Sequence, residues 1–141
     1  MTIDHIGLVV PSLQDGIQHW QDLFGYVQAS EVVTNTRQKV NVAFLCKSTS
    51  LPVKLVEPCD DSTPVSKFAR KGGGLHHVCW RCDDLETEIL RLREKGARLI
   101  TPPEPAEAFE NQQIAFLLVE RNLIVELIDT TRKARWKAVT L

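Results

Sequence analysis

The sequence repeats itself at one constant spacing, and this repeat limits the possible folds more than any other feature. His5 and His77 lie 72 residues apart. The same separation relates Leu13 to Leu85, Ile17 to Ile89, residues 43–45 to 115–117 (both Ala-Phe-Leu), Leu51 to Leu123, Val53 to Val125 and Leu55 to Leu127. One offset shared by several blocks indicates that a single unit has been duplicated. We expect one domain, 1–141, made of two repeats at about residues 1–60 and 74–130.

Each repeat has the same predicted order of elements. A short aliphatic strand carries the histidine, an amphipathic helix follows, and two or three further strands complete the unit. In the first repeat Ser12 is expected to cap the helix and Gly25 to follow its last turn. The apolar face of this helix consists of Leu13, Ile17, Trp20 and Phe24.

The helix of the second repeat carries matching signals. Asp83 is expected to cap it, with Glu86 three residues later as in a capping box. Its apolar stripe consists of Leu85, Ile89 and Leu92. Each helix would cover one sheet face and leave the other face to enclose a cavity. The predicted fold class is therefore α+β, with two tandem βαβββ modules that form a curved mixed sheet around a central cavity.

Three segments lie outside this plan. Pro64 suits the first turn of a helix, which predicts a linker helix over residues 64–71. The stretch "TPPEPAEAFENQ" is too rich in proline for a helix or a central strand, so we expect a mobile loop over one mouth of the cavity. The basic tail "RKARWK", which contains Trp136, is expected to be a solvated end.

Composition narrows the class of protein. A formal net charge of −1 gives no electrostatic reason to bind nucleic acid. No stretch is long enough to cross a bilayer, and the N-terminus has no basic region before an apolar one, so we expect a cytoplasmic protein without a membrane partner. Cys79 and Cys82 form a C-x-x-C without the second pair that a four-thiolate zinc site needs. They lie on a predicted strand and face opposite sides, as small buried hydrophobic residues.

The repeat makes a set of His5, Lys54, His77 and Glu126. The two histidines open equivalent strands, and Lys54 in "VKLVE" matches Glu126 in "VELID". If the two units pack about a pseudo-two-fold axis, these four side chains converge. Imidazole and carboxylate are common ligands of divalent zinc, manganese, iron, cobalt or nickel. A metal site is the favoured interpretation, and a metal-free pocket is the alternative.

The chain also resembles a known superfamily. The stretches that carry the resemblance are "DHIGLVVPSLQDGIQHWQDLFGY", "VNVAFL", "VKLVEP", "STPVSKFARKGGGLHHVCWRCDDLETEILRLREKGARLI" and "IVELID", which cover nearly the whole chain. They resemble the vicinal-oxygen-chelate superfamily, the glyoxalase and bleomycin-resistance fold, and within it the methylmalonyl-CoA epimerases. The resemblance implies one divalent metal in a cavity, a small-molecule substrate such as an acyl-CoA, and a homodimer.

Carried onto this chain, the resemblance puts metal ligands on His5, His77 and Glu126. The fourth ligand of the family, usually Glu or Gln, falls on Lys54, which is a departure from the pattern. Glu57 is three residues further along the same predicted strand and should face the other way. A second carboxylate, which is thought to be an acid/base partner in epimerases, falls on Arg37, or on Thr36 if the register slips.

Lys54 has three possible states beside a divalent cation, which repels an ammonium. It is neutral, it turns aside to pair with a substrate anion, or no metal is present and it pairs with Glu126. The leading hypothesis is a metal-dependent isomerase or lyase for a small acyl or carbonyl substrate, with Glu126 as base and Lys54 stabilising the enolate. The alternatives are an Fe(II)-dependent dioxygenase-like enzyme with the same ligands, and a metal-free binder that holds an anionic molecule with Lys54 and Arg37.

Overall fold

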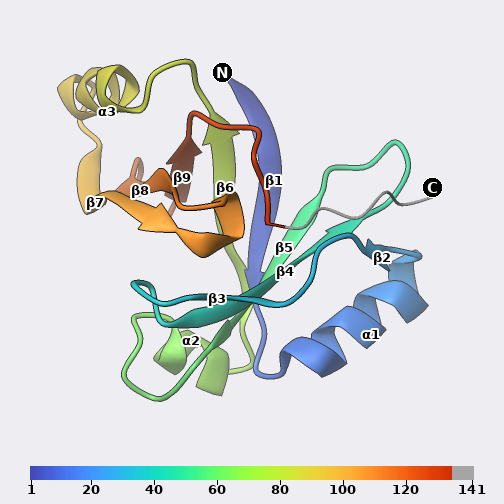
Figure 1. Cartoon of the computed structure of the whole chain (residues 1–141). Coiled ribbons are helices and arrows are strands. Elements are labelled where there is room, and N and C mark those ends of the chain that lie inside the picture. Colours follow the sequence, from blue (N-terminus) through green and yellow to red (C-terminus); the bar gives the residue numbers. More distant parts are fainter. Residues whose placement is uncertain (135–141) are drawn as a thin grey trace.

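The computed structural model describes residues 1–134, which form one nine-stranded sheet with helices on its outer side (Figure 1). The elements in chain order are β1 (Thr2–Val9), α1 (Leu13–Phe24), β2 (Val27–Gln28), β3 (Val33–Asn35), β4 (Val40–Cys46), β5 (Val53–Pro58), α2 (Ser66–Arg70), β6 (Gly74–Arg81), α3 (Leu85–Glu94), β7 (Arg98–Ala106), the 3₁₀ turn η1 (Glu107–Phe109), β8 (Gln112–Leu118) and β9 (Ile124–Ile128). The predicted fold class, α+β with a curved mixed sheet, is confirmed.

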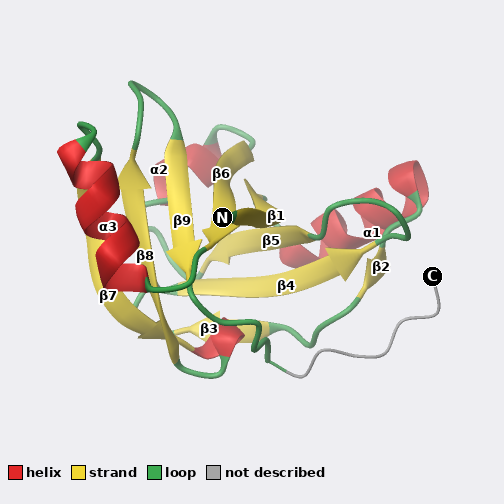
Figure 2. Ribbon diagram, turned by 90° about the horizontal axis from the view of Figure 1, so that it is seen from above, coloured by secondary structure: helices red, strands yellow, loops and turns green. Residues whose placement is uncertain are grey.

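The sheet order explains how two halves become one sheet. The strands lie in the order β2-β4-β5-β1-β6-β9-β8-β7, and β3 pairs with β4. In each half the first strand runs parallel to the last one, β1 to β5 and β6 to β9. The two first strands pair antiparallel at the centre and join the halves. Figure 2 shows α1 and α3 at opposite ends of this sheet.

The central pairing has the register of a pseudo-two-fold axis. His5 lies opposite Cys79, and Gly7 lies opposite His77. The repeat matches His5 with His77 and Gly7 with Cys79. A rotation that exchanges the two halves therefore converts the His5–Cys79 pair into the His77–Gly7 pair. The axis therefore passes between β1 and β6, and matched residues of the two halves face a common centre.

The predicted helix signals are mostly confirmed. Ser12 accepts a hydrogen bond from the backbone N–H of Asp15, and Gly25 ends α1 with a φ of 72°. Phe24 lies on the predicted apolar face, with its ring centre 4.9 Å from that of Trp20, but it is 50% exposed at the last turn. In α3 the capping prediction was wrong by one residue: Asp84 accepts the hydrogen bond from the backbone of Thr87.

The proline-rich segment is a strand, so the prediction of a loop was wrong. β7 runs through all three prolines of "TPPEPA" and pairs with β8. It is the last strand of the sheet, and its register shifts on both sides of Thr101. Proline is tolerated at such an edge because one side of the strand needs no partner and the shifts absorb the missing donors. The linker helix α2 begins at Ser66, two residues later than expected.

Lys133 and Ala134, at the start of the expected solvated tail, pack on the molecule, contrary to that prediction. The backbone N–H of Ala134 donates to the carbonyl of Ala108 at 3.0 Å, and the Lys133 side chain is 11% exposed. The rest of the predicted tail, including Trp136, lies outside the described residues.

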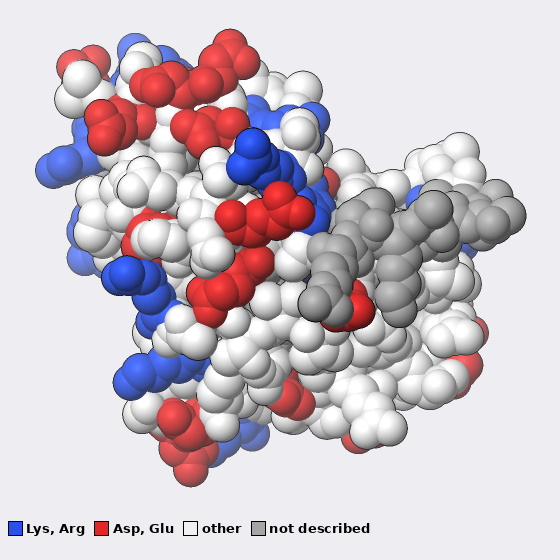
Figure 3. Space-filling model, viewed as in Figure 1, with Lys and Arg blue, Asp and Glu red and all other residues white. Residues whose placement is uncertain are grey.

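Cys79 and Cys82 lie on opposite faces of the sheet, as predicted. The thiols of Cys79 and Cys82 are unpaired and belong to two different core clusters, as expected for opposite strand faces. Basic and acidic side chains are interspersed on the face shown in Figure 3. No helix among residues 1–134 has the length and apolar character that a membrane span needs.

Candidate functional site

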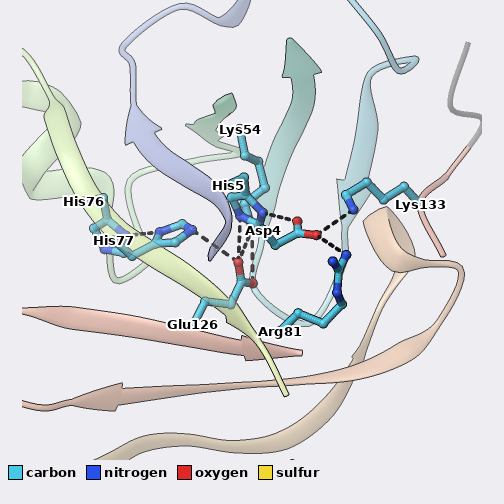
Figure 4. A network of polar contacts seen from close by, with 8 residues as sticks. All are labelled: Asp4, His5, Lys54, His76, His77, Arg81, Glu126 and Lys133. Atoms are coloured by element: carbon cyan, nitrogen blue, oxygen red, sulfur yellow. Dashed lines mark hydrogen bonds and ion pairs between the residues drawn. The ribbon is translucent and has the colours of Figure 1, made fainter. Parts of the chain in front are cut away.

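Three of the four matched side chains meet at the carboxylate of the fourth, Glu126, in the centre of the sheet (Figure 4). The Glu126 Oε1 atom lies 3.0 Å from His5 Nε2, 3.2 Å from His77 Nε2 and 2.9 Å from Lys54 Nζ. Lys54 Nζ also donates to Glu126 Oε2 at 3.1 Å. All four residues are buried. The structure thus brings together the residues that the repeat predicted, while their chemical roles stay predictions.

The electrostatics of this cluster keep Glu126 ionised. Burial alone would raise the pKa of the Glu126 carboxyl, but Lys54 and the two imidazoles outweigh it and hold the pKa well below its usual value. Burial also lowers the pKa of His77 to about 3, so this imidazole is neutral at neutral pH. The cluster therefore contains a carboxylate in direct contact with an ammonium.

A layer of charged groups behind the cluster supports His5. Asp4 Oδ2 lies 2.7 Å from His5 Nδ1, and Asp4 Oδ1 accepts from Lys133 at 2.9 Å and Arg81 at 3.2 Å. Burial would raise the pKa of Asp4, but His5 and Lys133 lower it below its usual value. These contacts fix the ring orientation of His5 and hold Asp4 as an anion.

The second histidine has a different support. The Nδ1 atoms of His76 and His77 are 2.8 Å apart, so one ring donates and the other accepts. Sequence reasoning missed both Asp4 and His76, although each directly precedes a predicted histidine and the repeat matches them with each other. Lys133 lies outside both repeats, and no sequence signal pointed to it.

Gly7 makes room for the ring of His77. A Cβ atom at position 7 would lie 2.1 Å from Cε1, 2.2 Å from Nε2 and 2.5 Å from Nδ1 of that imidazole. No side chain fits at such distances, so His77 reaches the cluster only because position 7 is glycine. The matched position in the other half, Cys79, carries a side chain.

A cavity of about 410 Å³ opens over the cluster. Lys54, His76, His77 and Glu126 line it, whereas His5 does not. The apolar part of its wall includes Val40, Val42, Val56, Ile114, Phe116 and Ile124. Arg37 and Lys39 also border it, and both are exposed. The cavity thus combines apolar walls and an ionic cluster with a rim that carries two basic residues and one acidic residue, Glu104, and it can hold a small organic anion.

The two halves also meet at the edge of this cavity. The Gln38 side-chain amide, in the turn before β4, donates to Glu104 Oε1 of β7 at 2.6 Å. Thr36, one possible position for a second base, uses its backbone N–H to bind Glu107 Oε2 at 2.9 Å. The proline-rich segment therefore does border the cavity, as a strand.

Glu57 is not part of the cluster, as expected from strand alternation. Its Oε2 atom accepts from the backbone N–H of Leu13 at 2.7 Å, and its Oε1 atom accepts from Asn41 at 3.2 Å. It therefore binds the first turn of α1 and cannot replace the missing fourth ligand.

The residues present satisfy only part of what a divalent metal needs. Donor atoms of His5, His77 and Glu126 lie within 4.8 Å of one another, and the buried Nε2 atoms of both histidines face the same oxygen, Glu126 Oε1, at 3.0 and 3.2 Å. These three form a possible ligand group. Lys54 opposes the metal, because an ammonium and a divalent ion about 4 Å apart repel by about 8 kcal/mol at an effective dielectric constant of about 20.

The wider charge balance also disfavours a metal. The two buried carboxylates of the cluster, Asp4 and Glu126, already contact three cationic side chains, those of Lys54, Arg81 and Lys133. A divalent ion would add positive charge to a buried site without a further anion to balance it. The site therefore does not fit a divalent metal while Lys54 is charged.

A second donor group is no better placed. Asp4, His5 and Cys79 also satisfy the spacing of metal ligands. Burial raises the pKa of the Cys79 thiol well above its usual value, however, and a thiolate is the form that binds metals. Asp4 is also occupied by two cations.

Comparison with known proteins identifies the family. Residues 4–116 match the Glyoxalase/Bleomycin resistance protein/Dioxygenase superfamily, and the chain belongs to this superfamily. A Bacillus subtilis relative, the uncharacterized protein YqjC, is 33% identical over 116 residues, which cover 82% of this chain and 81% of the relative.

Several solved structures with a similar fold are methylmalonyl-CoA epimerases. The methylmalonyl-CoA epimerase of Mycobacterium tuberculosis superposes with a TM-score of 0.80 at 28% identity, over 92% of this chain and 87% of that one. A variant of the Streptomyces coelicolor methylmalonyl-CoA epimerase, in complex with 2-nitronate-propionyl-CoA, superposes with a TM-score of 0.77 at 26% identity, over 92% and 96%. Among the structural neighbours are thus isomerases, one of them with a bound acyl-CoA analogue.

Proposed function

We propose that this protein is an isomerase that moves a proton on the carbon next to the carbonyl group of a small acyl-CoA. One observation carries the proposal: the ammonium of Lys54 and the carboxylate of Glu126 border the same apolar cavity, in contact with each other. The similarity to methylmalonyl-CoA epimerases supports the reaction class and the acyl-CoA.

The cavity suits the parts of such a substrate. Its apolar wall would hold the acyl chain, and Lys54 would attract the carbonyl oxygen. Arg37 and Lys39 at the rim would bind the carboxylate or phosphate groups outside the cavity. In this proposal Arg37 is a binding residue, because a guanidinium cannot accept a proton at neutral pH.

Proton transfer would use the pair in the centre. Glu126 takes the proton from the α-carbon, the C–H electron pair moves into the carbonyl, and Lys54 stabilises the resulting enolate oxygen. When Lys54 turns toward that oxygen, Glu126 loses its strongest partner, its pKa rises, and it becomes a better base.

Return of a proton to the other face of the enolate completes the isomerisation. With Arg37 at one expected acid/base position, we assign this step to His76, an imidazole that borders the cavity beside the cluster. The protonated ring of His76 would donate this proton to the enolate carbon and become neutral, while the proton taken up by Glu126 would leave to solvent and His76 would be reprotonated from solvent. Because burial lowers the pKa of His76, its protonated ring gives up a proton more readily than a free imidazolium.

Hydrogen exchange tests the reaction. Chelator-treated protein is incubated with methylmalonyl-CoA in deuterated water, and we expect one deuterium at C2. Lys54→Met and Glu126→Gln should each abolish exchange, while His19→Gln, a change at an exposed histidine of α1, should not. No exchange with the wild-type protein, with or without added metal, would end the epimerase proposal.

A metal-free binder of an anionic molecule is the second candidate, and the Lys54–Glu126 ion pair favours it. A binder would be stabilised against heat by methylmalonyl-CoA without any exchange. The dioxygenase alternative requires ferrous iron beside Lys54, and the charge balance disfavours it. Oxygen uptake by protein loaded with ferrous iron tests that alternative directly.

A further inference from the structure

We propose that the ammonium of Lys54 is the resident cation of this site and takes the place of the divalent metal that the fold family implies. The site would then hold an anionic oxygen of its ligand with a side chain of the protein itself. This inference concerns the cation, and it stands whether or not the chain is an isomerase.

The position of the amine is the first argument. Lys54 Nζ contacts both oxygens of Glu126, at 2.9 and 3.1 Å. Glu126 is the anionic member of the ligand group that includes His5 and His77. The amine therefore binds the carboxylate that a metal would need. Lys54 is also the residue at the position where the resemblance places a fourth metal ligand.

The charges around the site are the second argument. Glu126 is balanced by Lys54, and Asp4 on the far side of His5 is balanced by Lys133 and Arg81. No carboxylate of the described cluster is left to compensate two additional positive charges. An incoming group must instead bring negative charge, so the ligand class that fits is an organic anion such as a carboxylate or an enolate.

The surroundings of Lys54 are the third argument. The side chain is 3% exposed, with Nζ 5.3 Å from the centre of the Phe109 ring. Burial and this ring orient the amine, and the ring stabilises its positive charge. Lys54 nevertheless borders the cavity, so a ligand can reach the amine while Glu126 holds it.

Metal content separates this proposal from a conventional metal site. Wild-type protein, Lys54→Gln and Lys54→Glu are purified without added metal, dialysed against Zn²⁺ or Co²⁺, and measured by elemental analysis. We expect far less than one equivalent in the wild type and about one equivalent in Lys54→Glu, with an affinity at least about 100-fold tighter. Lys54→Gln should lie between them.

Two controls make the result decisive. Lys54→Glu combined with His77→Ala should lose the acquired metal, because one imidazole donor is missing. The Co²⁺ absorption spectrum of Lys54→Glu should show a protein-bound ion, and circular dichroism checks that each variant is folded. One equivalent of metal in wild-type protein, or no gain of metal in folded Lys54→Glu and Lys54→Gln, overturns the proposal.

Ligand binding provides an independent readout. Stabilisation of the wild type by methylmalonyl-CoA should be unchanged by a chelator and lost in Lys54→Met. If stabilisation requires added metal, the proposal is wrong. If the metal and binding results are as expected but deuterium exchange is absent, only the proposed reaction fails.

Discussion

The two halves of the molecule keep the same scaffold contacts and differ in the charges that they bring to the cavity. Glu57 binds the backbone N–H of Leu13 at the start of α1, and Asp129 binds that of Leu85 at the start of α3. Both contacts span 44 residues, so the duplication preserved the anchor together with its acidic character. Three residues before each of these anchors, the matched residues Lys54 and Glu126 carry opposite charges and form an ion pair. The contacts that anchor a helix within each half are alike. The matched residues that face the central cavity, Lys54 and Glu126, instead carry complementary charges.

The largest expected effect comes from breaking the complementary pair. Glu126→Gln leaves the ammonium of Lys54 buried without its anion, and we expect a loss of about 3–5 kcal/mol in the free energy of unfolding. Urea denaturation measures it. The double variant Lys54→Met/Glu126→Gln should recover part of the loss, because no charge remains unpaired. A loss below about 1 kcal/mol in the single variant would mean that the pair is not buried as described.

Acid should weaken the protein through His77. Burial lowers the pKa of His77 from 6.5 to about 3, so between these values the unfolded chain binds a proton that the folded protein does not. Stability contributed by the neutral ring is therefore complete above pH 6.5 and falls as the pH drops toward 3, by about 3 kcal/mol between pH 7 and pH 4. Asp4 and Glu126 act in the same direction, because their lowered pKa values make stability fall further at lower pH.

Thermal denaturation as a function of pH measures this effect. His77→Gln should flatten the profile between pH 6.5 and pH 4, while His19→Gln, at an exposed position, should leave it unchanged. Equal slopes in wild type and His77→Gln would contradict the assignment.

Gly7 and its matched residue Cys79 allow a steric comparison of the two halves. Gly7→Ala puts a methyl group against the imidazole of His77, and we expect a loss of about 2 kcal/mol together with a displaced ring. The matched change in the other half, Cys79→Ala, only removes a small buried group and should cost about 1 kcal/mol. Denaturant unfolding compares the two, and a larger loss in Cys79→Ala would contradict the steric argument.

The smallest effect tests the part of the scaffold that the halves share. Glu57→Gln and Asp129→Asn each replace a charged acceptor at a helix N-terminus with a neutral one, and each should cost about 1 kcal/mol or less. Their effects should agree within a few tenths of a kcal/mol and add in the double variant, because the two contacts share no partner. Strong non-additivity in equilibrium unfolding would show that the helices are coupled.

The repeat was sufficient to predict the fold and the convergence of the four central side chains, because a duplicated unit around an axis brings matched residues together. Local details were harder. Asp83 and Asp84 are both able to cap α3, and sequence alone did not choose between them. The prolines of β7 indicated a loop because their tolerance depends on the edge position of the strand, which only the complete sheet order reveals.

The contact of Lys133 with Asp4 could not be predicted from the repeat, for a different reason. Residue 133 follows the second repeat, so symmetry gives it no counterpart. Its basic neighbours suggested a solvated end, since tertiary contacts of a short tail leave no periodic pattern. Lys133 in fact joins a carboxylate near the other end of the chain.

The position of Lys133 makes the charge on the two sides of the site unequal. A duplicated unit by itself yields a cavity whose two sides are equivalent, and point changes such as the one at position 54 alter those sides one residue at a time. Lys133, which follows the second repeat, adds a cation behind His5, whereas the neighbour of His77 among residues 1–134 is the imidazole of His76. The uneven charge on the two sides of the site therefore depends partly on a residue outside the repeated units.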